Sequence, residues 1–227
     1  IDSSAFYNCT SLTTIELSEN LSSIGSGIFE NCKSLESIKI PQKFGYTMSD
    51  YSSSYKGPFY NCSSLKKVTF NEKCNLVMPY MFQNCTGIET IDLPDNISIL
   101  FGSTFEGCVN LKNINIPKSV ENIYDKAFRN CKSLENIILP ENLKKLSDSA
   151  FEGCANLKSI VIPDNTTDIG NYIFKNCSSL KSVKMPDNRE NITREMFSGC
   201  SSLKTIELPS SVTKIRQYAF YGCTSLE

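Results

Sequence analysis

Apolar side chains recur along this chain at a fixed spacing, and that spacing predicts the elements. A phenylalanine stands three residues before each of ten cysteines, which follow one another every 23 residues, with a single interval of 30. After Cys131, for example, apolar residues come at plus three, plus six and plus eight, as Leu134, Ile137 and Leu139. The alternation of the last two is typical of a β-strand. Proline follows at plus nine in seven repeats and ends the strand, because it has no amide hydrogen to donate.

Each repeat predicts one coil of a solenoid. Two further apolar positions, at plus twelve and plus fifteen, return the chain along the opposite wall, as Leu143 and Leu146 do. Stacked coils place equivalent residues in columns about 4.8 Å apart. Asn or Gly precedes every one of the ten cysteines, and these types enter the left-handed conformation most easily, so we expect them to cap a short helical turn.

The predicted fold is therefore an α/β solenoid that occupies residues 1–227 as a single unit. About ten coils of 23 residues would present a parallel β-sheet on the concave face and short helical or irregular turns on the convex face. Because the sequence starts and stops inside a repeat, we expect it to be a fragment of a longer array.

One repeat carries seven extra residues, which the 30-residue interval between Cys32 and Cys62 locates. The extra residues fall within a loop at 43–58, where Tyr46, Tyr51 and Tyr55 stand among Ser and Gly. Tyr and Ser on a protruding loop suit recognition of a partner. The alternative is a tolerated excursion without a role, since a longer loop costs little entropy.

The recurring pattern FxxCxxLxxIxLPxxLxxI resembles the BspA-like, treponemal class of leucine-rich repeats, and the resemblance covers the whole chain. It implies a curved solenoid with its parallel sheet inside. It also implies a surface or secreted adhesion protein of bacteria or protists, with a protein or glycan partner on a host or neighbouring cell. The residues themselves do not indicate the compartment, and they leave a cytoplasmic location open.

Composition narrows the classes of function. There are 23 basic and 24 acidic residues and no basic run, so the charge that nucleic-acid binding needs is missing. No apolar stretch approaches the roughly 18 residues of a spanning helix, so we expect no membrane insertion by this segment. Histidine is absent, which removes Ser/His/Asp and Cys/His catalysis and the usual zinc ligand. We expect no enzyme activity, no cofactor and no metal.

The cysteines invite a disulfide interpretation, but their geometry favours buried free thiols. Ten of the eleven occupy one predicted core column, and Cys74 falls at an apolar position of its own repeat. Neighbours in a column would lie near 4.8 Å, outside the roughly 3.5–4.5 Å between Cβ atoms that a disulfide needs. Eight N-x-S/T sequons are also present, but four of them arise from the repeat itself, with the cysteine as middle residue.

Partner recognition can use only side chains that point away from the core. On the predicted strands these lie at plus four, plus five and plus seven. At plus seven, Ile138 and Val161 stand side by side in an otherwise polar column. The patch predicted for binding consists of Asn113, Asn115, Asn136, Ile138, Ser159 and Val161. The alternative is that β-branched residues merely suit strands. A row of lysines at plus four favours an acidic partner or a glycan, or else a solvated strand edge that prevents unwanted pairing. The chain is thus predicted to be a non-catalytic protein-binding module or, alternatively, a structural spacer without a specific ligand.

Overall fold

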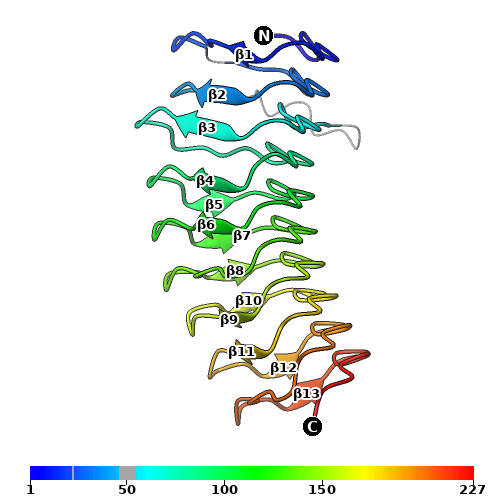
Figure 1. Cartoon of the computed structure of the whole chain (residues 1–227). Coiled ribbons are helices and arrows are strands. Elements are labelled where there is room, and N and C mark those ends of the chain that lie inside the picture. The colour runs from blue at the N-terminus through cyan, green and yellow to red at the C-terminus, as the bar shows by residue number, and fades with distance from the viewer. Residues whose placement is uncertain (22, 46–54) are drawn as a thin grey trace.

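The computed structural model describes residues 1–21, 23–45 and 55–227. Their backbone forms coils that stack in chain order along one axis, with the two termini at opposite ends of the stack (Figure 1). The strands within the described residues pair only in parallel. Partners are usually 23 residues apart, as in Thr14↔Ser37, and β2 and β3 pair across the 30-residue interval through Ser37↔Lys67. The predicted parallel solenoid with a coil of about 23 residues is confirmed, and the insertion leaves the stacking intact.

One wall of the solenoid, called here the first wall, contains the strands predicted from the plus-six and plus-eight positions. They are β1 (Thr14–Ile15), β2 (Ser37–Ile40), β3 (Lys67–Phe70), β4 (Thr90–Asp92), β6 (Asn113–Asn115), β9 (Ser159–Val161) and β11 (Ser182–Lys184). They form three short sheets in the orders β1-β2-β3, β4-β6 and β9-β11. In β4, β6, β9 and β11 the middle residue is buried and its two neighbours are exposed, because alternate side chains point to opposite faces.

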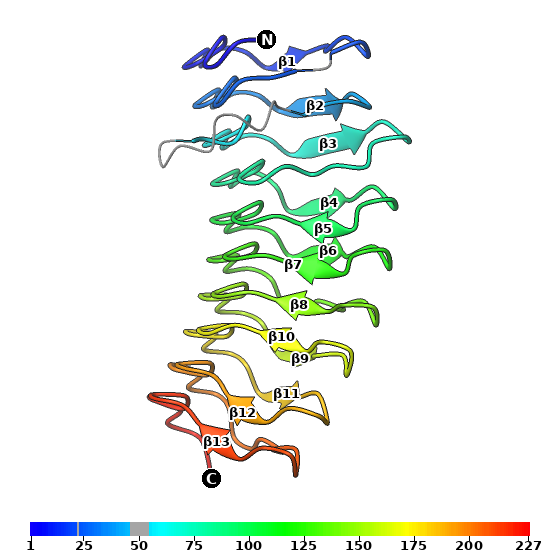
Figure 2. The same ribbon diagram turned by 180° about the vertical axis from the view of Figure 1, so that it is seen from behind.

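The opposite wall, called the second wall, also forms parallel ladders. Its strands are β5 (Ile99–Leu100), β7 (Asn122–Ile123), β8 (Lys145–Leu146), β10 (Asp168–Ile169), β12 (Asn191–Ile192) and β13 (Lys214–Ile215). Four of them pair in the order β5-β7-β8-β10, and β12 pairs with β13. Each ends on the apolar plus-fifteen residue of its coil. The two walls thus enclose the core from both sides (Figure 2).

The turns that join the walls correct one expectation: the described residues contain no helix. In the turn before Cys131, alternate amides donate within the turn and to the next coil. Arg129 N donates to Lys126 O at 3.0 Å, whereas Phe128 N donates to Ala150 O at 2.9 Å. Lys126 and Asn130 both have a positive φ, near 60°. Two left-handed residues four apart interrupt any helical run and aim every second amide at the neighbouring coil. The left-handed conformation predicted before the cysteine is confirmed, but it does not cap a helix.

The core consists of columns of equivalent side chains. Phenylalanine rings stack from Phe6 to Phe220, for example Phe128 on Phe151 with centroids 5.3 Å apart and planes 2° from parallel. All eleven cysteines are free. From Cys32 onward, each cysteine of the repeat column donates its thiol hydrogen to the phenylalanine carbonyl of the preceding coil at 3.0–3.2 Å. The predicted thiol column is confirmed, with Cys9 exposed and Cys223 half-buried in the terminal coils.

The described ends of the 43–58 loop carry buried aromatic side chains, whereas a protruding recognition loop was predicted. Tyr55 is buried and its ring packs against Tyr80, with centroids 5.8 Å apart. Before the insertion, Phe44 is also buried and packs on Phe59. Burying these large rings stabilises the join between the loop and the coil, so Tyr55 serves packing and not an exposed surface. The other predicted loop residues, Tyr46 and Tyr51, lie outside the described residues.

Candidate partner-binding site

Two apolar side chains project from the middle of the first wall into solvent. Ile138 is 84% exposed and Val161 is 57% exposed, and they occupy equivalent positions of adjacent coils. Among the described residues, every other exposed large apolar side chain lies in the first coil or beyond residue 207. Single exposed apolar residues are common and need no explanation. Two neighbouring ones in the interior of the stack form a contiguous exposed apolar patch, which is typical of an interaction site.

The pair lies in a groove on the first wall. Two adjoining hollows of about 760 Å³ and 500 Å³ share Ser159, Ile160, Val161 and Lys184, and together we call them the strand-face groove. The larger hollow contains Ile138 beside Asn136. The smaller extends along β11 to Leu208 in the next coil. The groove therefore runs across the coils, along the axis of the stack.

The sheet is interrupted where the groove begins. The coil that carries Ile138 forms no strand on this wall, and only a single bridge joins Asn136 to Ser159. The sheet to which β6 belongs ends there, and the sheet of β9 and β11 starts on the other side. Ile137 and Leu139 nevertheless remain buried, so the coil keeps its core contacts while Ile138 faces outward.

The structure brings together four of the six residues predicted on this face. Asn136, Ile138, Ser159 and Val161 line one hollow. Asn113 and Asn115 are exposed on β6, in the coil before Asn136, and they do not line the groove. They extend the same face toward the N-terminus as a polar margin.

Acidic residues on the rim of the groove are absent from the sequence-based prediction. Glu141 and Asp164 line the larger hollow, and Asp187 and Glu207 line the smaller one. The first three stand ten residues after successive cysteines, directly after the proline, so the 23-residue period could have located them. All four are exposed, and none forms an ion pair with a described residue. With Lys184, four carboxylates and one ammonium give the groove a formal charge of −3.

The lysine row at plus four is partly neutralised. Lys112 pairs with Glu89 at 2.7 Å, and Lys158 pairs with Glu135. Those lysines hold the pKa of both carboxyls below the ordinary value, chiefly through the hydrogen bond that each donates. Pairing of this kind favours the solvated-edge interpretation of the row.

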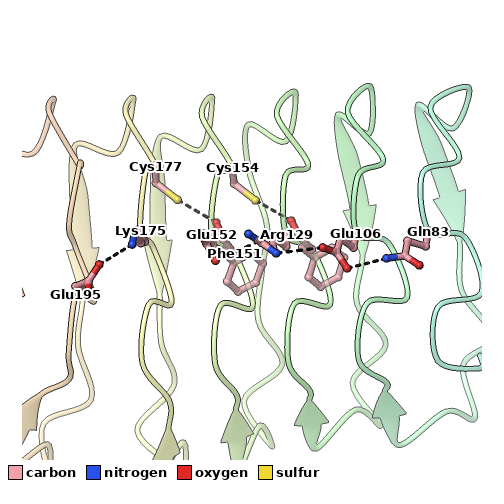
Figure 3. A network of polar contacts seen from close by, with 10 residues as sticks. Gln83, Glu106, Arg129, Phe151, Glu152, Cys154, Lys175, Cys177 and Glu195 are labelled. Atoms are coloured by element: carbon pink, nitrogen blue, oxygen red, sulfur yellow. Dashed lines mark hydrogen bonds and ion pairs between the residues drawn. The ribbon is translucent and has the colours of Figure 1, made fainter. Parts of the chain in front are cut away.

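A second polar cluster lies on the turns, away from the groove (Figure 3). Arg129 lies between two carboxylates of adjacent coils, 3.4 Å from Glu106 and 3.3 Å from Glu152, and Gln83 donates to Glu106 at 2.9 Å. Farther along, Lys175 pairs with Glu195 at 2.6 Å. Arg129 therefore bridges one carboxylate from the preceding coil and one from the following coil. The cluster links successive coils.

The described residues lack the features of two other classes of site. They contain no group of three or more Cys, Asp or Glu side chains arranged to hold a metal ion. They also include no helix of the length and apolar character required to cross a membrane.

Comparisons with known proteins place these features in a family. A leucine-rich repeat protein from Bacteroides ovatus is 32% identical, with a TM-score of 0.86 over 100% of this chain and 56% of that one, so the chain spans just over half of that protein. A leucine-rich repeat protein from Treponema pallidum is 29% identical, with a TM-score of 0.64 over 66% of this chain and 70% of that one.

The pneumococcal vaccine antigen PcpA shares the fold at 20% identity, with a TM-score of 0.57 over 92% of this chain and 64% of that one. No curated protein matches the chain significantly. The family described as BspA type leucine rich repeat region matches residues 1–109 and 102–227, in six copies. The chain therefore belongs to the BspA-type leucine-rich repeat family.

Proposed function

We propose that this chain is a non-catalytic protein-binding module that recognises a macromolecular partner through the strand-face groove. Leucine-rich repeat solenoids generally bind proteins, and their outward strand positions are free to vary while the inward ones hold the stack. The observation that carries the proposal is the exposed pair Ile138 and Val161 in the middle of a groove on the first wall.

The composition of the groove supports a protein partner over a glycan. An apolar centre surrounded by hydrogen-bonding side chains is the usual arrangement of a protein interface. Asn136 and Ser159 supply that polar margin beside Ile138 and Val161, and Asn113 and Asn115 extend it. The BspA-type resemblance supports a surface or secreted location and an adhesive role.

Replacing both apolar residues by lysine tests the proposal. A random-peptide phage library and a panel of purified extracellular-matrix and serum proteins are screened on the immobilised chain. We expect the ligands obtained to bind an Ile138→Lys/Val161→Lys variant at least about 30-fold more weakly, because two central apolar contacts are each worth about 1 kcal/mol or more. Circular dichroism should be unchanged, since both side chains are exposed.

A matched control places the same charges on the second wall and the last turn. Ile215 is 56% exposed and Tyr221 is 70% exposed, so Ile215→Lys/Tyr221→Lys adds two lysines outside the groove. This variant should bind like the unaltered chain. Equal binding by the groove variant would reject the proposed surface. If no peptide or protein bound specifically, the chain would be a structural spacer.

A further inference from the structure

The charge of the strand-face groove indicates the kind of partner that fits it. We infer that the groove receives a cationic amphipathic protein segment, whose apolar side chains cover Ile138 and Val161 and whose Lys or Arg side chains face the acidic rim. The inference rests on the proposed function and adds the chemistry of the ligand.

The acidic rim is continuous along the groove. Glu141, Asp164 and Asp187 occupy the same position in three successive coils, so adjacent carboxylates are separated by about one coil spacing, roughly 4.8 Å. Asp164 and Asp187 are also linked, because the Asp187 amide donates to the Asp164 carboxylate at 3.1 Å. The three side chains are exposed and have no ion-pair partner among the described residues, so their charge is available to a ligand.

Basic side chains lie on the other side of the strands. The basic residues stand just before the outward-facing strand positions of their coils, as Lys158, Lys181 and Lys204 do. The acidic residues of the rim come after those strand positions. Lys158 is neutralised by Glu135, and Lys181 and Lys204 do not line the groove. Lys184 is the one basic side chain of the groove lining. A bound segment would therefore direct its positive charges toward the acidic rim and its apolar side chains toward the middle of the wall.

The same features oppose other ligands. A net charge of −3 repels the phosphates of nucleic acid and acidic peptides. A cationic segment without apolar side chains would leave Ile138 and Val161 in water and lose the burial of apolar surface. The ligand therefore needs both positive charges and apolar side chains.

Three labelled peptides of equal length separate these requirements. One is composed of Leu and Lys, one of Leu and Glu, and one of Ser and Lys, and their binding to the whole chain is measured by fluorescence anisotropy. We expect the Leu/Lys peptide to bind at least about tenfold more tightly than either of the others, because it alone satisfies both the apolar centre and the acidic rim. Its affinity should fall when NaCl is raised from about 50 mM to about 500 mM.

Neutralising the rim provides the decisive comparison. The variant Glu141→Gln/Asp164→Asn/Asp187→Asn keeps the size of each side chain and an oxygen acceptor at Asp164. We expect it to bind the Leu/Lys peptide about fivefold to tenfold more weakly at low salt, since exposed charge pairs contribute a few tenths of a kcal/mol each. The control Glu72→Gln/Asp95→Asn/Asp125→Asn changes the net charge equally at exposed positions outside the groove, and should bind normally.

The outcomes distinguish this inference from the proposed function. Three results would overturn the inference that the ligand is a cationic amphipathic segment. They are stronger binding by the Leu/Glu or Ser/Lys peptide, an equal loss of affinity in both neutralised variants, and no binding of the Leu/Lys peptide. If library-derived ligands still bound the Ile138→Lys/Val161→Lys variant more weakly than the unaltered chain, the groove would remain the proposed binding surface. If they bound both equally, the proposed function itself would be overturned.

Discussion

Replacing Phe151 by alanine is expected to lower the free energy of unfolding by about 3–5 kcal/mol. Phe151 is fully buried, and its ring stacks on Phe128 at 5.3 Å and on Phe174 at 6.0 Å. Truncation removes both contacts and leaves a cavity that the neighbouring coils cannot fill, because their backbones are fixed by ladders on each side. Urea unfolding followed by circular dichroism measures the change.

A second effect follows from the linear arrangement of the coils. In the middle of the stack each coil packs on its two neighbours, so a defect there weakens the coupling between the two halves. We expect the Phe151→Ala transition to be broader than that of the unaltered chain. Phe101→Ala is the matched control, since Phe101 is half-buried and stacks only on Tyr124 among the described rings. The control should cost about 1 kcal/mol. A loss below about 1 kcal/mol at Phe151 would contradict the stacked core.

Raising the pH above 9 is expected to destabilise the fold steeply. Burial raises the pKa of Cys154 to about 12 and that of Cys131 well above its ordinary value of 9.0. These thiols stay protonated in the folded chain but ionise near pH 9 when the chain unfolds. The protonated thiols therefore contribute fully to the free energy of unfolding below pH 9. This contribution is lost as the pH rises from 9 toward the pKa of the folded state.

The number of thiols makes the effect large. Nine cysteines are buried, and each one that ionises only in the unfolded chain lowers the unfolding free energy by about 1.4 kcal/mol per pH unit above 9. Because folded domains are stable by only about 5–15 kcal/mol, we expect the urea midpoint to fall sharply between about pH 9 and pH 10 in the presence of a reductant.

Two measurements check that the thiols cause this loss. In the Cys131→Ala/Cys154→Ala variant the slope above pH 9 should be smaller by about 3 kcal/mol per pH unit. With the folded chain at pH 8, an aromatic disulfide reagent should modify the exposed Cys9 first and the half-buried Cys223 more slowly. An unchanged midpoint up to pH 10, or rapid modification of the buried column, would show that the thiols reach water.

The repeat made most of the fold predictable. A fixed 23-residue offset places Phe128, Phe151 and Phe174 in equivalent positions, so stacking one coil fixes the contacts of all the others. The same offset predicted that the cysteines would be buried and that Asn or Gly before them would be left-handed. Predictions that depend on columns are reliable because every repeat tests them again.

Features without a distinctive residue type were not predictable. The second left-handed position found in most turns is occupied by residues as different as Lys126, Tyr172 and Glu195, so no side chain marks it. Without that position, the turn was expected to be helical. The second wall has strands of only two residues, too short for an alternation to be recognised. The burial of Tyr55 depends on how the insertion returns to its coil, which the sequence does not specify.

The sequence predicts part of the candidate site, because only some of its residues follow the strand period. The strand period identifies Ile138 and Val161 as outward-facing. The extent of the groove depends on where the sheet is interrupted, and no sequence pattern marks the single bridge at Asn136. The predicted patch therefore includes Asn113 and Asn115, although they lie one coil outside the lining of the groove. The acidic rim follows the period but lies after the strand, and the predicted patch contains only residues of the predicted strands.

Hydrogen–deuterium exchange tests the strand-face groove most directly. The chain is compared with and without a saturating concentration of a library-selected peptide. We predict slower amide exchange in segments 136–141, 159–165 and 182–187, because a bound segment would cover these parts of three successive coils. The turns around Arg129 and the second-wall strands should exchange as before. Protection confined to the turns or the second wall, with none in the groove segments, would contradict the proposed binding surface.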